Sequence, residues 1–405
     1  MCRIIIVADK PSAIKNALGR RIGRNSLGTK NSLKHERYRQ YMKILKQGIV
    51  YRAQGQPFRY QGWPSIAVDE KDTLYAVFSG YRSSHVCPMG KTVMCVSFNG
   101  GELWSCPIIV NDTKYDDRDA GITYLGEGKM LLSWFHNTPE YYVGPWRDRV
   151  EGKAEPDALP VVLGMLKTYE TYPKDDCVAK SYTMISDNYG MSWGSKCEIP
   201  VSAPHGAAYT ASGRLLYVGK VTKGHSEMVG NRLYNPADIA LYESFDEGKS
   251  WEFVSAVPLD DIDIRKNSYE PHITELADGT LLAAVRLGEK EDFTIYTVRS
   301  ADGGKTWSEP AMTGICGSPP HLLPLRDGSL LLSYSRRLDP CGSRARISTD
   351  GGLTWGEEYV LSEAPTNDHG YAATAELSDG SLVTVYYEIY GDDTKTSILY
   401  TKWEL

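Results

Sequence analysis

The sequence lacks the long apolar segments that define membrane and exported proteins. No stretch approaches the roughly 18 apolar residues that a membrane-spanning helix requires. The one apolar run near the start, Ile4 to Ala8, is too short for the core of a signal peptide, and no small-residue cleavage site follows it. These absences predict a cytoplasmic protein with no membrane partner.

Cysteine pairs and glycine-rich loops are also missing. The 8 cysteines include no Cys-x-x-Cys pair, so their spacing predicts no zinc site. In a reducing compartment they are expected to be thiols. There is no P-loop, and no glycine-rich dinucleotide fingerprint follows a predicted strand. The sequence therefore predicts neither a metal nor a cofactor.

Charge is spread unevenly along the 405 residues. Residues 1–52 contain 13 Lys or Arg and 2 Asp or Glu, a net charge of +11, whereas the remaining residues carry a net −17. A basic arm can bind nucleic acid, but this one lacks the interleaved aromatic residues of single-strand binders. We predict a basic, partly helical extension over 1–52, with a helix over Leu33 to Gln47, and no nucleic-acid partner. The oligomeric state stays open.

A short motif, Ser-x-Asp/Asn-x-Gly-x-x-Trp, occurs five times. Its Asp or Asn side chain bonds backbone amides of its own turn, and its glycine supplies a positive φ. Its tryptophan is an apolar plug between neighbouring sheets. The copies span Ser97–Trp104, Ser186–Trp193, Ser244–Trp251, Ser300–Trp307 and Ser348–Trp355, and their tryptophans are 89, 58, 56 and 48 residues apart.

A second repeat runs in phase with the first and predicts six innermost strands. Each member leaves a loop and enters a strand-like run, and four are followed by an Asp-Gly or Ser-Gly turn. The members are Trp63-Pro64-Ser65, Asp119-Ala120-Gly121, His205-Gly206-Ala207, Glu270-Pro271-His272, Pro320-His321-Leu322 and Gly370-Tyr371-Ala372. Together the repeats predict an all-β fold, a six-bladed β-propeller of four-stranded antiparallel blades over residues 53–405.

The longest gap between tryptophans contains an insertion near residues 137–180. It is rich in proline, tyrosine and charge, and insertions into repeats map to loops on one face, often the binding face. We therefore expect it to overhang the central pocket. The starts of the inner strands converge on the axis of a propeller, so polar residues there are the candidates for a site.

From about residue 58 to 405 the chain resembles the sialidase family, whose Asp boxes have the form of the five-fold motif. In that family the boxes are structural and lie away from the active site. Glu270-Pro271 through Asp278-Gly279 to Arg286 resembles the family's Glu-Pro…Leu-x-Asp-Gly…Arg segment. The resemblance implies that Glu270 polarises the nucleophile and that Arg286 binds the substrate carboxylate. Tyr371 matches the tyrosine nucleophile, which sets sialidases apart from most glycosidases.

The chain departs from the family at the first blade and at the third carboxylate-binding arginine. The family's Arg-Ile-Pro is Gly62-Trp63-Pro64 here, so the first of three carboxylate-binding arginines is missing. The segment expected to hold the acid/base Asp has none, and His85 is its closest ionisable side chain. Several arginines compete for the third carboxylate position, and we assign Arg336 from the set Arg336, Arg337, Arg344 and Arg346.

These observations define a predicted site at the propeller axis. The catalytic residues are Tyr371, Glu270 and His85. The substrate-binding residues are drawn from strand starts and the loops that follow: Arg286, Arg82, Arg336, Asp119, His205, His321 and Trp63.

Three functions remain open on the sequence alone. The first is an exo-acting glycoside hydrolase that cleaves a terminal acidic sugar, sialic acid or a relative, with retention through Tyr371. The second is a lyase or hydrolase acting on uronate- or rhamnose-containing glycans, with His85 as base and Tyr371 as acid. The third is a non-catalytic glycan-binding propeller, which predicts that Tyr371 and Glu270 do not touch. All three take a carbohydrate partner.

Overall fold

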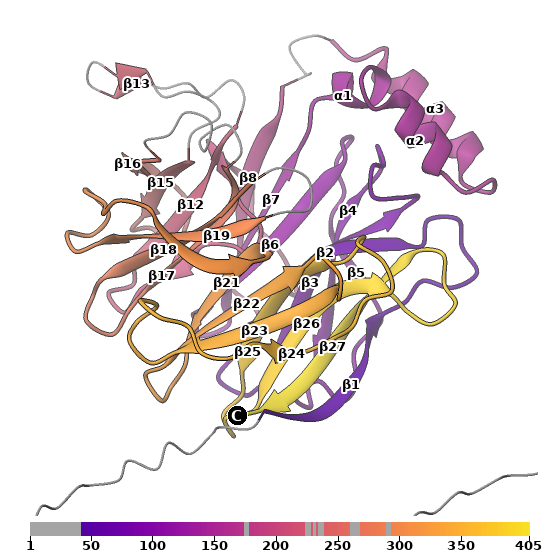
Figure 1. The fold of residues 1–405 in the computed structure, drawn as a ribbon. Helices are drawn as coiled ribbons and strands as arrows, with labels where there is room; N and C mark the ends of the chain where they lie inside the picture. The colour runs from indigo at the N-terminus through magenta and orange to yellow at the C-terminus, as the bar shows by residue number, and fades with distance from the viewer. Residues whose placement is uncertain are drawn as a thin grey trace, which may run out of the picture. The chain divides into compact units, whose positions relative to one another are not determined.

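Antiparallel strands dominate the described part of the chain. The computed structural model describes residues 42–173, 178–222, 228–229, 232–233, 239–259, 268–288 and 293–405. Its large sheets are the six blades of a propeller, each built on four strand positions (Figure 1). The predicted six-bladed β-propeller is confirmed. None of the helices in these described residues is long and apolar enough to cross a bilayer.

The first three blades follow one another along the chain, each running from the axis outward. The first contains β2 (Tyr60–Val68), β3 (Leu74–Arg82), β4 (Lys91–Ser97) and β5 (Ile108–Asn111). The second contains β6 (Asp117–Gly126), β7 (Lys129–His136), β8 (Lys180–Ser186) and β9 (Cys197–Ile199). The third contains β10 (Val201–Ser202), β11 (Ala208–Tyr209), β12 (Leu215–Val221), β15 (Ile239–Ser244) and β16 (Glu252–Ala256).

In the third blade β10 and β11 together take the place of one inner strand, because both pair with β12. The hairpin of β13 (Met228–Val229) and β14 (Arg232–Leu233) forms a separate small sheet.

The last three blades complete the ring. The fourth contains β17 (Ser268–Glu275), β18 (Leu281–Leu287), β19 (Thr294–Ser300) and β20 (Ala311–Cys316). The fifth contains β21 (Ser318–Pro324), β22 (Leu330–Arg336), β23 (Gly342–Ser348) and β24 (Tyr359–Val360). The sixth contains β25 (Gly370–Glu376), β26 (Leu382–Ile389), β27 (Thr396–Glu404) and β1 (Lys43–Tyr51).

The ring closes because strands from opposite ends of the chain share the sixth blade. β1 pairs antiparallel with β27, from Lys43 opposite Glu404 to Tyr51 opposite Ile398. The predicted domain boundary at residue 52 is therefore wrong: β1 precedes it and belongs to the propeller. The predicted helix over Leu33 to Gln47 is also wrong from Lys43 onward, because strand pairing overrides local helix propensity there. Its earlier residues lie outside the described ones.

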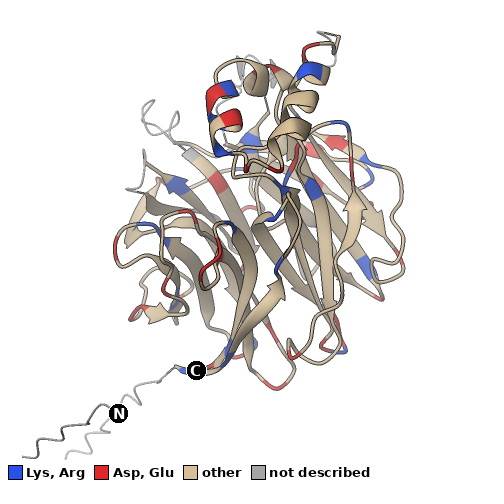
Figure 2. Cartoon of the chain, turned by 90° about the vertical axis from the view of Figure 1, so that its right-hand side faces the viewer, with Lys and Arg blue, Asp and Glu red and all other residues tan. Residues whose placement is uncertain are grey.

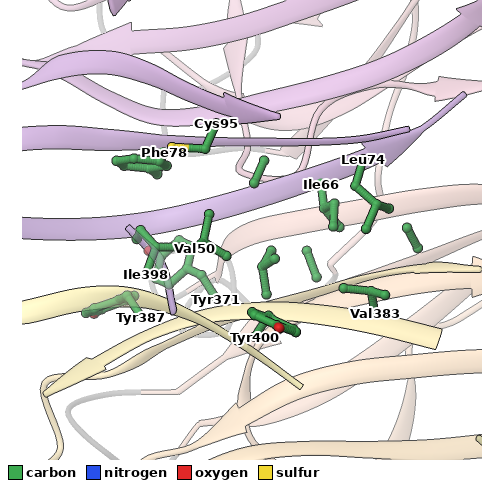
Figure 3. Packing of buried hydrophobic residues seen from close by; sticks show 14 of the residues in the cluster. Val50, Ile66, Leu74, Phe78, Cys95, Tyr371, Val383, Tyr387, Ile398 and Tyr400 are labelled. Carbon is green, nitrogen blue, oxygen red and sulfur yellow. The ribbon is translucent and has the colours of Figure 1, made fainter. Parts of the chain in front are cut away.

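The interface between the first and sixth blades is filled by apolar side chains from both (Figure 3). Phe78 and Cys95 come from the first blade, and Val383 and Tyr400 come from the sixth. All four side chains are almost completely buried. Tyr371 belongs to the same cluster, so the core that joins these blades also supports a residue of the predicted site.

The five Asp boxes form the predicted turns. In the copy that ends at Trp307, the Ser300 hydroxyl accepts the amide of Gly304 at 2.8 Å and Asp302 accepts the amide of Thr306 at 2.9 Å. The Trp307 indole donates to Ser255 of the preceding blade at 2.9 Å. Each turn is therefore fixed internally, and its tryptophan connects two blades.

The insertion between β7 and β8 forms three short helices at one end of the blades (Figure 2). They are α1 (Pro139–Val143), α2 (Arg147–Lys153) and α3 (Leu159–Tyr169). Tyr142, Val150 and Leu166 bury their side chains against one another and against Val86, from the loop that follows β3. The helices are thus a packed unit that covers part of the axial face.

Candidate functional site at the propeller axis

The inner strands are distorted in the same way in blade after blade. Five residues at equivalent positions have a positive φ that non-glycine residues rarely adopt, and strand pairing shifts or breaks at each. These residues are Trp63, Asp119, His205, Glu270 and Tyr371, with φ values of 55°, 49°, 71°, 49° and 59°. The distortion turns each side chain toward the axis, which is how residues from five blades come to share one site.

Tyr371, Glu270 and Arg286 form a continuous chain of contacts. The Tyr371 hydroxyl donates a short hydrogen bond to Oε1 of Glu270. The other carboxylate oxygen of Glu270 lies 2.5 Å from Nη1 of Arg286. Tyr371 comes from the sixth blade and the other two residues from the fourth, so the sequence correctly placed three distant residues together.

The phenol of Tyr371 is neutral in this setting. Burial raises its pKa well above the usual value, and the charges of Glu270 and Asp119 raise it further. Arg286 and Arg337 act in the opposite direction. A neutral oxygen hydrogen-bonded to a carboxylate can attack an electrophilic carbon that bears a negatively charged group without the repulsion an anionic nucleophile would meet, and it can lose its proton as it does so.

Arg337, not Arg336, is the arginine of the fifth blade that reaches the site. Its guanidinium lies 5.9 Å from the ring of Phe293, and Arg286 lies 4.3 Å from the same ring. Burial opposes the charge of Arg337, but Tyr387, Tyr371, Glu270 and Asp368 raise its pKa, so it is cationic. Arg336 instead lies 3.6 Å from Glu358. The structure therefore places Arg337, and not the Arg336 predicted from sequence, beside Tyr371 and Glu270.

A third cation, Arg118, occupies the neighbourhood of the missing first-blade arginine. Its guanidinium lies 4.1 Å from the centre of the Trp63 ring. It comes from β6 in the second blade, and 9% of its side chain is exposed. Burial opposes its charge, but Asp116, at 3.4 Å, raises its pKa, followed by Tyr142, Asp119 and Tyr371. The tryptophan that replaces the family's arginine therefore supports an arginine from the next blade.

Arg82 lies behind this layer and is completely buried. Its guanidinium spans both carboxylate oxygens of Asp116, with one contact of 2.9 Å and one shorter. Its guanidinium also lies over the Trp63 ring, 4.6 Å from the ring centre. Because Asp116 neutralises it and no surface of it is exposed, we assign Arg82 a structural position rather than a substrate contact.

His85 forms a dyad with Asp368 at the rim of the site. Nδ1 of His85 lies 3.0 Å from Oδ1 of Asp368, and the Tyr60 hydroxyl donates to the same oxygen at 2.9 Å. Burial lowers the pKa of His85, and the contact with Asp368 opposes that shift. Since Asp368 holds Nδ1, the other ring nitrogen is the one available to a substrate.

Asp119, from the second blade, adds a carboxyl group to the cavity beside Glu270. It lines a cavity of about 350 Å³ together with Glu270 and Tyr269. Burial raises its pKa to about 7, although Arg118 lowers it. Asp119 is therefore protonated below that pH and can donate a hydrogen bond to a sugar hydroxyl.

The three histidines of the inner strands lie deeper in the channel. The rings of His205, His272 and His321 lie 4.8 to 5.9 Å apart and line a separate cavity of about 360 Å³. Burial lowers the pKa of each below the usual value. Among the three, His205 is the one whose ring lies beside Tyr371, with ring centres 6.1 Å apart. His321 lies with the others along the deeper cavity.

Two of these histidines are in a form that disfavours a metal. His272 accepts the amide of Leu322 at 3.0 Å and His321 accepts that of Thr374 at 3.4 Å, both through Nδ1. Each neutral ring therefore carries its proton on Nε2. A metal could bind that nitrogen only after the proton had left. Across the described ranges, no group of three or more His, Cys, Asp or Glu side chains is arranged to hold a metal ion.

Sequence reasoning missed Asp368, Tyr60 and Arg118 as members of the site. Asp368 lies three residues before Tyr371, at the start of the sixth inner strand, and that position was a usable signal. Arg118 belongs to the run Asp116-Asp117-Arg118-Asp119, which stands out in the sequence by its charge. The fold alone shows that this arginine faces Trp63.

The architecture defines a class of fold, the six-bladed β-propellers with four-stranded antiparallel blades. Solved structures agree in fold. A protein of unknown function from Dyadobacter fermentans has a TM-score of 0.69 at 21% identity, covering 90% of this chain and 99% of its own. The intramolecular trans-sialidase of Ruminococcus gnavus, in complex with oseltamivir carboxylate, has a TM-score of 0.64 at 16% identity, covering 88% and 97%.

A more distant structure widens the range of chemistries on this fold. The α-L-arabinanase of Penicillium chrysogenum, complexed with arabinobiose, has a TM-score of 0.54 at 13% identity, covering 88% of this chain and 98% of its own. No curated protein matches the sequence.

The family itself is settled by sequence. Residues 163–387 match the model of the BNR repeat-like domain, which is more than half of the chain. The protein belongs to this family of BNR-repeat proteins.

Proposed function

We propose that the protein is an exo-acting glycoside hydrolase that removes a terminal acidic sugar, sialic acid or a relative, from a glycan and retains the anomeric configuration. The observation that carries the proposal is the contact chain from Tyr371 through Glu270 to Arg286. The relatives by fold include enzymes that act on glycans, which supports the same class of activity.

In the first step the Tyr371 oxygen attacks the anomeric carbon while Glu270 accepts the phenol proton. Protonated His85 gives its proton to the glycosidic oxygen, the bond from that oxygen to the anomeric carbon breaks, and a glycosyl-tyrosine forms. Arg286 and Arg337 pair with the sugar carboxylate. Arg118 supplies a further positive charge from the second blade.

In the second step neutral His85 takes a proton from a water molecule as that water attacks the anomeric carbon. The bond to Tyr371 breaks, and the phenolate recovers its proton from Glu270. Tyr371 and the water attack the anomeric carbon from opposite faces, and each attack inverts its configuration. The two inversions together retain the original configuration.

One observation favours the uronate or rhamnose-glycan alternative. The pKa of His85 is lowered, so the ring is largely neutral at neutral pH and is ready to act as a base. In a lyase, His85 would take the proton next to the carboxylate and Arg337 would neutralise that carboxylate. The binding-only alternative required Tyr371 and Glu270 to be apart, and their hydrogen bond is the opposite of that requirement.

The test is release of methylumbelliferone from its α-sialoside by wild type, Tyr371→Phe and Tyr386→Phe. Tyr386 is a matched control because it is buried in the same blade and bonds Thr401 instead of the site. We expect turnover by wild type and Tyr386→Phe, and a loss of about 10³-fold in Tyr371→Phe.

No turnover by wild type would reject sialosides as the substrate. Uronate- and rhamnose-containing glycans are then supplied, and an increase in ultraviolet absorbance from an unsaturated product would identify a lyase. Equal turnover by wild type and Tyr371→Phe would reject the tyrosine mechanism.

A further inference from the structure

A cavity of about 430 Å³ continues from the site toward the helical insertion. His85, Asp368 and Arg337 line it at the end shared with the site. Arg149 and Lys153 of α2 line it at the other end. The cavity is therefore part of the same opening, between the rim dyad and the insertion.

The charge of this cavity is unbalanced toward the positive. Its four cationic side chains are Arg149, Lys153, Arg337 and Lys395, and its one carboxylate is Asp368. Asp368 is already bonded by His85 and Tyr60, and Lys395 is paired with Glu155 at 3.2 Å. Arg149 and Lys153 are exposed, and neither forms a hydrogen bond or ion pair with another side chain of the described residues.

The insertion is anchored to the propeller, which fixes the backbone from which these two side chains extend. Val150, between them on α2, is completely buried among the helices. The Tyr142 hydroxyl donates to Asp116 at 2.5 Å, and Lys395 donates to the carbonyl of Lys153 at 3.1 Å. Arg149 and Lys153 are four positions apart, which places them on one face of the helix.

The position of His85 gives the cavity its place in the reaction. In the proposed function His85 delivers a proton to the oxygen of the leaving group, and His85 also lines this cavity. The unit that follows the scissile bond must then extend into the space beneath α2. Cations in that space with no charged partner among the described residues favour an anion, because they gain charge-assisted hydrogen bonds when one binds.

We propose that Arg149 and Lys153 form a subsite for a carboxylate or sulfate group on the unit next to the cleaved sugar, so that the substrate is a glycan with adjacent anionic units. This inference rests on the proposed function. The subsite selects the substrate through its second unit, independently of how the terminal carboxylate is recognised.

The experiment compares kcat/KM for three substrates with the same terminal sugar. They are 3′-sialyllactose, whose next unit is neutral, α2,8-linked disialic acid, whose next unit carries a carboxylate, and a 3′-sialyllactose sulfated on its galactose. We expect wild type to prefer the carboxylate or the sulfate substrate by about fivefold, since each exposed ion pair contributes modestly. The preference should shrink as salt rises.

The variant R149Q/K153Q should lose the preference while its kcat/KM for 3′-sialyllactose stays at the wild-type value. The control is R147Q/K167Q, which removes two charges from the same insertion at positions that do not line the cavity. Because Arg147 pairs with Glu151 and Glu170, this variant also reports any general loosening of the insertion. A preference that survives in R149Q/K153Q, or a wild type without one, would overturn the subsite.

A binding measurement keeps the subsite testable if no sialoside is turned over. Digalacturonate is titrated into wild type, R149Q/K153Q and R147Q/K167Q by calorimetry. Binding weakened about fivefold in R149Q/K153Q alone would support the anionic subsite while the sialoside function fails. Equal affinity in all three proteins, or no binding to any of them, would overturn the subsite.

Discussion

The Asp boxes repeat around the same ring as the axial bulges, which are the five inner-strand positions with a positive φ. The boxes preserve their residues, and the bulges preserve their backbone conformation. The boxes keep their residues: a serine, an Asp or Asn, a glycine and a tryptophan recur in five blades. The bulges keep their backbone conformation, because Trp63, Asp119, His205, Glu270 and Tyr371 all have a positive φ, while no two of the residues are alike.

The difference follows from what each repeat must do. A box fixes one turn to the next blade, and every blade has the same neighbour relation, so one residue set suits all of them. The bulges meet at a common axis, where each must contribute a different chemical group to one site. If the proposed site is correct, repetition of residues marks stability in this protein, and repetition of backbone with varied residues marks function. Four experiments test this separation, from the largest expected effect to the smallest.

Glu270→Gln should have the largest effect, on activity alone. Glutamine can still accept a hydrogen bond from Tyr371 but cannot take its proton. We expect kcat/KM, measured on the α-sialoside or on whichever glycan the wild type turns over, to fall about 10³-fold with little change in melting temperature. Glu275→Gln, on the same strand β17 but outside the cavity beside Glu270, should keep wild-type activity. Similar losses in both variants would mean that β17 was disturbed as a whole.

Arg337→Met and Arg336→Met separate two adjacent arginines. Removing Arg337 should lower kcat/KM about 10²-fold, because the substrate carboxylate loses a charged partner in a mostly enclosed site. Removing Arg336 should change it little, since that side chain faces Glu358. Steady-state kinetics on both variants decides the assignment. The reverse ranking would return the carboxylate contact to Arg336.

Gly304→Ala should damage stability and spare activity. Gly304 has a φ of +93°, and a Cβ there would lie 2.4 Å from Leu241. We expect a loss of about 3 kcal/mol in the free energy of unfolding, from backbone strain and overpacking together. Gly279 has a φ of +83° and open space around its Cβ position, so Gly279→Ala should cost about 1 kcal/mol. Urea unfolding measures both values, and equal costs would remove packing from the explanation.

Asp368→Asn should change the pH dependence more than the maximal rate. Asp368 favours the protonated form of His85, so its removal should lower the pKa of His85 further. The proposed mechanism needs protonated His85 in its first step, so it predicts that kcat/KM falls above that pKa. We expect this fall to begin about one pH unit lower in the variant. An unchanged profile would show that His85 is not the titrating acid.

The sequence was sufficient for the blades because each blade is a local object. A box spans eight residues, and its hydrogen bonds run between residues two to four positions apart, such as Ser300 with Gly304. The match of Glu270, Arg286 and Tyr371 to a known family then placed these three residues in one site. The boundary at residue 52 failed because β1 has no periodic signal of its own and is a strand through its pairing with β27.

The site beyond those three residues depended on tertiary contacts. Two adjacent arginines, Arg336 and Arg337, are equivalent in the sequence, and only the direction of the chain after β22 decides which faces the axis. The sequence shows that Trp63 stands where the family has an arginine. It does not show that Arg118, from another blade, lies against Trp63.

By itself, therefore, the sequence determined how many blades form and which inner-strand residues approach the axis, since strand period, turn chemistry and glycine conformation are local. The tertiary structure decided which charges are neutralised, as Arg82 is by Asp116, and which have no charged side-chain partner among the described residues, as is the case for Arg149 and Lys153. Charge pairing depends on distance in space, and the closure of a ring brings together side chains that are hundreds of positions apart.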